Sequence, residues 1–243
     1  MYKTVTRGFV PEDKKEFTGE GIEKLKKAAE EVAFLLERGY SVKTATTFVG
    51  NHHLLSERQR LALARGLAAK EVLENRKKKE CDILGLKGRK VYMDGFNIII
   101  TLEVAFSESV IIKGEDNTIR DLAGLRGTYQ IIDKTEKAIL SILNALDKLK
   151  VAQLEIYLDS PVSNSGRLKN FILELSEPYQ VEVIVSVIPD VDRVLYTKEG
   201  VITSDAVILD NCSSWINLTP YLLKEEEKYT YWMVEITREQ EKK

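Results

Sequence analysis

The chain has 243 residues, an apolar fraction of 44% and a formal net charge of −2, which suits one large globular domain or two small ones. No apolar run approaches the roughly eighteen residues of a membrane span, and no signal-peptide core opens the chain, so we expect a soluble, cytoplasmic protein without a membrane partner. The two cysteines, Cys81 and Cys212, exclude a disulfide framework, and without a CxxC motif no structural zinc site is expected.

The charge is distributed unevenly along the chain. Residues 1–90 hold 20 lysines and arginines against 13 acidic residues, which leaves 16 against 25 for residues 91–243. A basic part joined to an acidic part is typical of a nucleic-acid-binding surface beside a metal-binding site. Two oppositely charged parts that dock on each other would have the same composition, so both interpretations stay open.

The first third of the chain is predicted to be all-helical. Apolar residues recur at three- and four-residue steps over residues 22–36, and a short helix follows over residues 43–48. A turn over residues 50–53 contains His52 and His53; adjacent side chains tend to diverge, so a metal site shared by the two histidines is not expected. Ser56 then caps a long helix that ends near residue 80.

Basic side chains gather at the start of this long helix. Arg58 and Arg60 lie in its first turns, and Arg65 follows Arg58 by seven residues, a spacing that puts both on one face and suits phosphate contacts. Residues 76–79 add a basic run at the helix end, where cations also favour the helix dipole. Solvated arginines beside a capped turn are the alternative interpretation.

Residues 81–89, with two glycines and no periodicity, are predicted to link a basic helical domain (residues 1–80) to an α/β domain (residues 90–243). Apolar and β-branched runs predict strands at residues 90–94, 98–104, 109–113, 153–159, 181–188, 201–205 and 229–235. Helical spacing predicts helices at residues 128–150, 168–175 and 215–223. Strands that alternate with helices imply a parallel sheet with flanking helices.

Several of these strands end in an aspartate, namely Asp94, Asp159 and Asp205, and Asp190 follows the strand at residues 181–188. Parallel strands place such ends on one edge, where clustered carboxylates repel one another unless a cation neutralises them. A single aspartate at a strand end is usually a helix or turn cap. Its repetition in successive units instead favours a Mg²⁺ or Mn²⁺ site, because these ions prefer oxygen ligands.

The motif Asp-Gly-Phe-Asn at residues 94–97, the strand that ends in Asp159 and Thr-Ser-Asp at residues 203–205 resemble the acidic positions of the PIN and NYN group of metal-dependent ribonucleases. These enzymes usually carry a further acid on a helix after the first strand. The nearest candidates in this chain are Asp121 and Glu103. The resemblance implies a PIN/NYN-like parallel-sheet domain.

Nearly the full length also resembles a largely uncharacterised, mostly archaeal two-part family. In that family a helical unit carries Val-Gly-Asn and Arg-Gln-Arg, found here at residues 49–51 and 58–60. A PIN-like unit follows with Leu-Asp-Ser-Pro-Val-Ser-Asn-Ser-Gly-Arg, found here at residues 158–167.

We therefore predict a Mg²⁺- or Mn²⁺-dependent endoribonuclease acting on single-stranded or structured RNA. Its metal ligands would come from Asp94, Asp121, Asp159, Asp205 and Asp210. Asn97 would join Asp94, Asp159 and Asp205 in catalysis by orienting a carboxylate or a metal-bound water. Small polar residues and arginines would receive phosphate, namely Ser160, Ser163, Asn164, Ser165, Arg167, Ser204, Arg58 and Arg60. A helix N-cap is the alternative interpretation for residues 163–166.

Two other functions fit parts of the pattern. A phosphatase would use Asp94 as nucleophile, but Phe96 occupies the place of the second acid in the usual Asp-x-Asp pair. A non-catalytic RNA- or protein-binding module would keep a degenerate acidic edge, and metal affinity separates it from the nuclease. The sequence is compatible with a homo-oligomer and shows nothing that reads bases.

Overall fold

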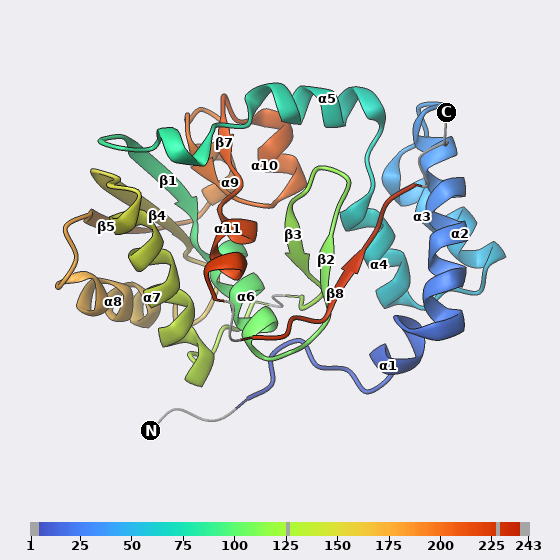
Figure 1. The fold of residues 1–243 in the computed structure, drawn as a ribbon, viewed down its shortest axis with the longest axis horizontal. Helices are drawn as coiled ribbons and strands as arrows, with labels where there is room; N and C mark the ends of the chain where they lie inside the picture. The colour runs from blue at the N-terminus through green and yellow to red at the C-terminus, as the bar shows by residue number, and fades with distance from the viewer. Residues whose placement is uncertain (1–4, 125–126, 227–228, 239–243) are drawn as a thin grey trace.

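The computed structural model describes residues 5–124, 127–226 and 229–238, and it places a helical unit beside an α/β unit (Figure 1). The helical unit consists of α1 (Asp13–Glu16), α2 (Gly19–Leu36), α3 (Val42–His52), α4 (Glu57–Gly66) and α5 (Lys70–Lys79). The last of these, α5, extends away from the others and contacts α10 (Ala206–Asn211) of the α/β unit. Among the described residues, no helix is long and apolar enough to cross a membrane.

Two helical predictions in this unit were wrong in their boundaries. Helix α3 continues through the predicted turn to His52. The predicted long helix is interrupted after Gly66, because Leu67 adopts an extended conformation and is buried in the core. Ile236 packs directly against Gly66, so close that a Cβ atom there would lie 2.4 Å from the Ile236 Cβ. Tertiary packing therefore ends α4 and redirects the chain into α5.

A small sheet packs against these helices. Its order is β3 (Ile119–Asp121), β2 (Ile111–Lys113) and β8 (Met233–Glu235), with β2 antiparallel to β3 and parallel to β8. The predicted strand near the C-terminus is thus present as β8. The side chains that this sheet region adds to the helical core are Val110, Ile112, Leu122, Val234 and Ile236. The core of the helical unit therefore contains residues from both sides of the 81–89 segment.

The main sheet is parallel, as predicted, and has five strands. Its order is β5 (Glu182–Ile188), β4 (Gln153–Asp159), β1 (Lys90–Asp94), β6 (Val201–Ile202) and β7 (Trp215–Ile216). The chain leaves the central β1 towards β4 and later returns to its other side with β6. Such a reversal of strand order is where open α/β sheets bind their ligands, beyond the carboxyl ends of the strands.

Helices cover both faces of this sheet, which confirms the flanking-helix prediction. One face packs against α6 (Gly95–Phe106), α7 (Asp133–Lys148), α8 (Ser165–Ser176) and α11 (Leu218–Glu225). The other face packs against α9 (Val191–Leu195) and α10. The segment between the units forms a short 3₁₀ turn, Ile83–Gly85, and Glu80 pairs with Trp215 at the sheet edge.

Two predictions in the α/β unit were wrong in type. Residues 98–104 are not a strand but part of α6, in which every residue except Asn97 is buried. A helix that is apolar on all sides has lost the periodicity that identifies helices, so its isoleucine run resembles a strand. Residues Trp215–Ile216 form β7 rather than the start of a helix, and the Trp215 Nε1 donates to the Arg76 carbonyl at 2.7 Å.

Candidate functional site

A cavity of about 250 Å³ opens at the carboxyl edge of the main sheet, between the two units. Four of the predicted site acids line it, together with Asn97 and Ser204. The charged residues in its lining are Arg65, Asp94, Arg120, Asp121, Asp159, Asp192 and Asp205. The structure thus brings side chains that are far apart in sequence to one place.

Asp94 ends β1 and is buried, with only 7% of its surface exposed. It caps α6, because its Oδ1 accepts from the Asn97 backbone N–H at 3.4 Å. The Thr203 hydroxyl donates to its Oδ2 at 3.2 Å. Gly95 is required behind it, since a Cβ there would lie 2.6 Å from a Leu158 methyl group. Asp94 is therefore both the N-cap of α6 and a lining residue of the cavity.

The loop after β6 holds Asn97 in place. The backbone N–H and the hydroxyl of Ser204 donate to the Asn97 Oδ1 at 2.8 and 2.9 Å. Asp205 follows and caps α10, accepting from Val207 N at 2.8 Å and Ile208 N at 3.2 Å through the same oxygen. The carboxylate of Asp205 is thereby fixed next to Asp94.

Asp192 is a site residue that the sequence interpretation missed. Asp190, which was considered there, instead caps α9 by accepting from Arg193 N at 3.2 Å. Asp192 lies two residues further on and lines the cavity with Asp159. The sequence Asp-Val-Asp at residues 190–192, just after β5, is the signal that could have identified Asp192.

The acids destabilise one another's charge. Burial raises the pKa of Asp94 to about 8, and the nearby Asp205 and Asp192 add to this effect. Partial burial together with Asp205 and Asp159 raises the pKa of Asp192. Burial also raises the pKa of Asp159, although the Val191 backbone N–H opposes the shift. Acidic groups are therefore concentrated here, and within residues 5–124, 127–226 and 229–238 none of Asp94, Asp159, Asp192 and Asp205 forms an ion pair with a basic side chain.

The two arginines in the lining are already paired with other acids. The Arg120 Nη2 donates to the Asp116 Oδ2 at 2.6 Å, and its Nε donates to the Ser204 carbonyl at 2.6 Å. Arg65, from α4, donates to the carbonyl of Asp121 and lies 3.4 Å from its Oδ1. Arg65 therefore neutralises Asp121, which makes this predicted ligand the least available of those in the cavity.

The remaining acids fit a hard divalent cation. Asp94, Asp159, Asp192 and Asp205 offer only oxygen donors, the type that Mg²⁺ and Mn²⁺ prefer. Within the described part of the chain, no three of these carboxylates place one oxygen each within 4.8 Å of one another. This spacing does not form a closed set of protein ligands, and Mg²⁺ commonly binds one or two carboxylates and keeps several waters.

Two predicted or considered acids lie elsewhere. Asp210 is bound by Arg76 of α5, whose Nε and Nη2 donate to it at 2.7 and 3.1 Å. Glu103 is fully buried on α6, where it pairs with the Arg7 Nε at 2.6 Å and accepts from the Tyr129 hydroxyl at 2.6 Å. Neither lines the cavity.

The predicted phosphate-binding arginines of the helical unit, Arg58 and Arg60, lie outside the cavity and make polar contacts with neighbouring parts of the protein. Arg58 makes a two-pronged pair with the buried Asp13, both contacts at 2.7 Å. Arg60 donates to the Leu55 carbonyl at 3.0 Å and to the Asn51 Oδ1 at 2.8 Å.

The 160–167 segment also lies outside the cavity, apart from its neighbour Asp159. The Asn164 Nδ2 donates to the Tyr129 carbonyl at 2.7 Å, and Ser163 forms a backbone bridge with Thr128. Ser165 is buried, while Ser160 and Arg167 are exposed. Of the predicted substrate-binding residues, the cavity therefore contains Ser204 alone.

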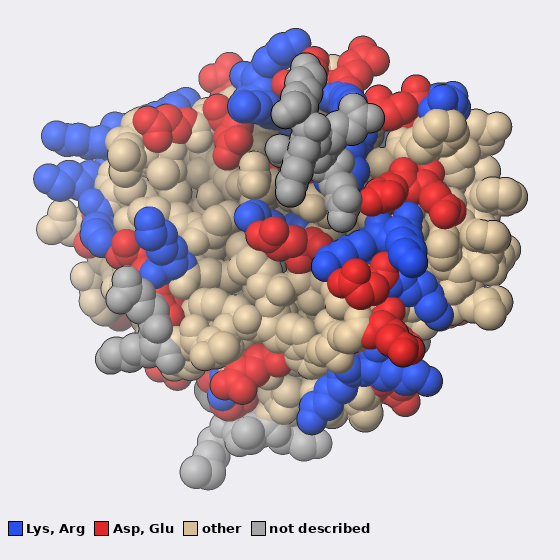
Figure 2. Space-filling model, turned by 45° about the vertical axis from the view of Figure 1, so that its right-hand side comes forward, with Lys and Arg blue, Asp and Glu red and all other residues tan. Residues whose placement is uncertain are grey.

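Contacts between basic residues of α5 and acidic groups of the α/β unit account for part of the uneven charge distribution along the chain. Arg76 pairs with Asp116 at 2.7 Å as well as with Asp210, and the Lys79 Nζ donates to carbonyls at the end of α10, including that of Asp210 at 3.0 Å. On the face turned forward in Figure 2, basic and acidic side chains lie next to each other rather than in one basic patch.

Comparison with known proteins places the chain in a family. The family model described as a protein of unknown function (DUF434) matches residues 24–79, and the one described as a domain of unknown function (DUF5616) matches residues 83–221. The uncharacterized protein MJ0935 of Methanocaldococcus jannaschii is 35% identical over 185 residues, which cover 76% of this chain and 88% of that protein. No solved structure matches the chain. The chain therefore belongs to the DUF5616 family, in the two-part form in which a DUF434 unit precedes that domain.

Proposed function

We propose that the chain is a Mg²⁺- or Mn²⁺-dependent ribonuclease of the PIN/NYN type that cleaves phosphodiester bonds in the cavity at the sheet edge. The observation that carries the proposal is the convergence of Asp94, Asp159, Asp192 and Asp205 around one cavity, where none of the four forms an ion pair with a basic residue that the structure describes. A carboxyl group in a cleft, with its pKa raised to about 8 by burial and by neighbouring acids, supports a functional site, because active sites are where such shifts are arranged.

The four acids divide into two pairs in this proposal. Asp94 and Asp205 would hold the ion from the two strands that flank the reversal of strand order, and Asp159 and Asp192 would bind it directly or through water. A bound divalent ion would lower the pKa of a coordinated water and stabilise charge on the leaving oxygen. Asn97 keeps its orientation through Ser204, and its backbone N–H in turn orients the Asp94 carboxylate.

The opposite wall of the cavity suits a phosphate. Arg65 reaches in from α4 and stays partly exposed, with 33% of its side chain accessible, although Asp121 holds one of its nitrogens. An arginine anchored in this way presents its remaining N–H groups in a fixed direction, as phosphate recognition requires. The choice of RNA follows the resemblance of the Asp-Gly-Phe-Asn motif to PIN/NYN ribonucleases.

Metal binding and RNA cleavage test the proposal together. Mn²⁺ is titrated calorimetrically into the wild-type chain and into Asp94→Asn and Asp205→Asn, while cleavage of end-labelled single-stranded RNA is followed with the same preparations. We expect each substitution to weaken Mn²⁺ binding and to lower cleavage by at least about 100-fold. Asp82→Asn is the matched control, because this aspartate is exposed and only caps the 3₁₀ turn through Leu84 N.

The outcomes separate the alternatives. Cleavage that persists in Asp94→Asn would come from a contaminating nuclease or from another site, and would refute the proposal. RNA binding without Mn²⁺ binding and without cleavage would favour a binding module with a degenerate acidic edge.

A further inference from the structure

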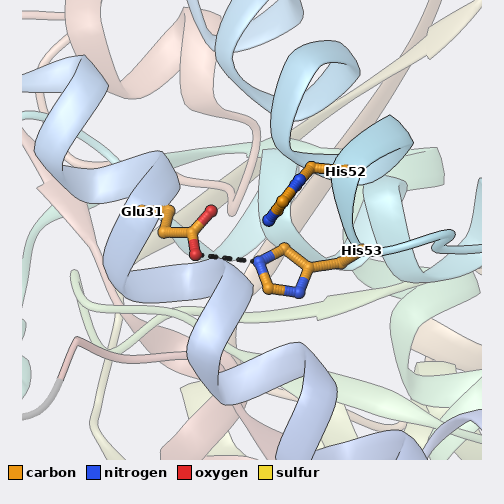
Figure 3. Close-up of side chains that lie close together, drawn as sticks. All are labelled: Glu31, His52 and His53. Atoms are coloured by element: carbon orange, nitrogen blue, oxygen red, sulfur yellow. Dashed lines mark hydrogen bonds and ion pairs between the residues drawn. The ribbon is translucent and has the colours of Figure 1, made fainter.

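A second cluster of metal-binding side chains lies on the helical unit, away from the acidic cavity. Glu31 of α2 and the adjacent His52 and His53 point toward one another (Figure 3). One ligand atom from each residue lies within 4.8 Å of the others, and within the described residues this is the group of three that meets this spacing. The expectation that the two histidine side chains diverge was therefore wrong.

The end of α3 explains why the rings converge. His52 is the last residue of the helix, and His53 is its C-cap with φ −87° and ψ 4°, so the backbone turns between them. The two rings meet edge to face, with centroids 4.9 Å apart and planes at 83°. In this arrangement the His53 Nε2 lies 2.9 Å from the Glu31 Oε1. Ring geometry and a neighbouring helix thus bring two imidazoles and a carboxylate together.

We propose that Glu31, His52 and His53 form a Zn²⁺ site that joins α2 to α3. Imidazole nitrogens suit Zn²⁺ and related late transition metals, whereas Mg²⁺ and Mn²⁺ favour all-oxygen sets such as the acidic cavity. Zn–N and Zn–O bonds near 2.0–2.1 Å require ligand atoms about 3.3 Å apart in a tetrahedron. The His53 Nε2 and the Glu31 Oε1 lie 2.9 Å apart, somewhat closer than this spacing. Glu31 and His52 are exposed, so rotation of their side chains can bring the three ligand atoms to it.

Zn²⁺ would take the place of the hydrogen that His53 and Glu31 now share. The imidazole then carries its proton on Nδ1 and offers the Nε2 lone pair to the ion, while Glu31 remains a carboxylate. Two neutral imidazoles and one carboxylate leave the site with one positive charge, and water completes the fourth position at the surface. The site links helices that pack side by side, so occupancy stabilises the helical unit.

Zn²⁺ titration into the full-length chain, followed by calorimetry and by thermal unfolding, tests this site. We expect saturable binding of one equivalent, a rise of several degrees in the unfolding midpoint, and at least about tenfold weaker affinity in Glu31→Gln and His53→Gln. Glu30→Gln is the matched control, because it makes the same chemical change at the exposed neighbouring position on α2. Asp94→Asn controls for Zn²⁺ in the acidic cavity.

Co²⁺ supplies a readout that does not depend on stability, because a tetrahedral Co²⁺ site absorbs visible light far more strongly than octahedral Co²⁺ in water. The absorption should be present in the wild-type chain, Glu30→Gln and Asp94→Asn, and absent in His52→Gln and His53→Gln. Circular dichroism confirms that each variant is folded. The proposal is overturned if wild-type protein shows no saturable Zn²⁺ binding at about 100 μM free metal, or if Glu31→Gln and His53→Gln bind Zn²⁺ as tightly as Glu30→Gln.

Discussion

The metal-free protein should become more stable when Asp94 is replaced by asparagine. Asp94 is held in a buried position beside Asp205 and Asp192, and burial raises its pKa from 3.8 to about 8. Asparagine has the same shape and keeps an oxygen that accepts from the Asn97 N–H, but it carries no charge. The change removes an electrostatic cost that a bound cation would otherwise relieve.

The sign and size of the effect follow from proton linkage. The native state keeps the Asp94 proton up to about pH 8, whereas the unfolded chain loses it near pH 3.8, so the native state binds more protons between these values. The free energy of unfolding therefore falls as the pH rises from about 4 to about 8 and levels off above. At pH 7 the cost is of the order of 4 kcal/mol, at 1.36 kcal/mol per pKa unit, or roughly 8–16 °C in the unfolding midpoint.

Urea unfolding in the presence of a chelator, followed by tryptophan fluorescence at pH 5, 7 and 8.5, measures this difference. Asp94→Asn should gain stability over the wild type as the pH rises, and its own pH slope should be smaller but not zero, because Asp159 and Asp192 also have raised pKa values. Asp82→Asn should follow the wild type. Equal slopes for wild type and Asp94→Asn would refute the reasoning, since they would mean that Asp94 ionises normally in the folded chain.

Three further results are expected. Gly66→Ala should destabilise the chain by roughly 1–3 kcal/mol in thermal unfolding, because the added Cβ would lie 2.4 Å from the Ile236 Cβ. Gly85→Ala is the control and should not destabilise the chain, because a Cβ there meets nothing within 4 Å. Arg120→Met should cost roughly 3 kcal/mol of unfolding free energy, because it leaves a buried carboxylate without its closest guanidinium; an unchanged urea midpoint would contradict this. Mn²⁺ binding at pH 7 should release about one proton from Asp94. The calorimetric heat of binding should then vary with the ionisation enthalpy of the buffer, and a heat that does not depend on the buffer would contradict this.

Much of the acidic edge could be predicted from the sequence because two independent patterns coincide there. Strands β1 and β4 are short apolar runs, and each ends in an aspartate at the residue where the structure ends the strand. The parallel pairing of these strands follows from their alternation with helices. Local pattern and connectivity together therefore bring Asp94 and Asp159 to one edge.

The positions of Arg65 and Asp192 at the cavity could not be predicted in the same way. Arg65 and Asp121 meet only because α4 packs against the small sheet, a contact between segments 56 positions apart. Asp192 follows its strand by several residues, beyond a cap that Asp190 provides. Single-sequence patterns register the residues next to a strand or helix end, whereas these positions depend on tertiary packing.

The same packing shows why the helical unit and the acidic domain belong together. Arg120 joins three segments at the cavity: its guanidinium donates to the Ser204 carbonyl beside the acids, to the Arg65 carbonyl of α4 at 2.8 Å, and to Asp116 in the β2–β3 hairpin. The apolar face of the small sheet, including Ile112 and Val234, is buried only against the helices. Without the helical unit that face would be exposed and Arg65 would be missing from the cavity. The acidic side chains of the cavity thus all come from one unit, whereas Arg65 lines the cavity only because the two units meet.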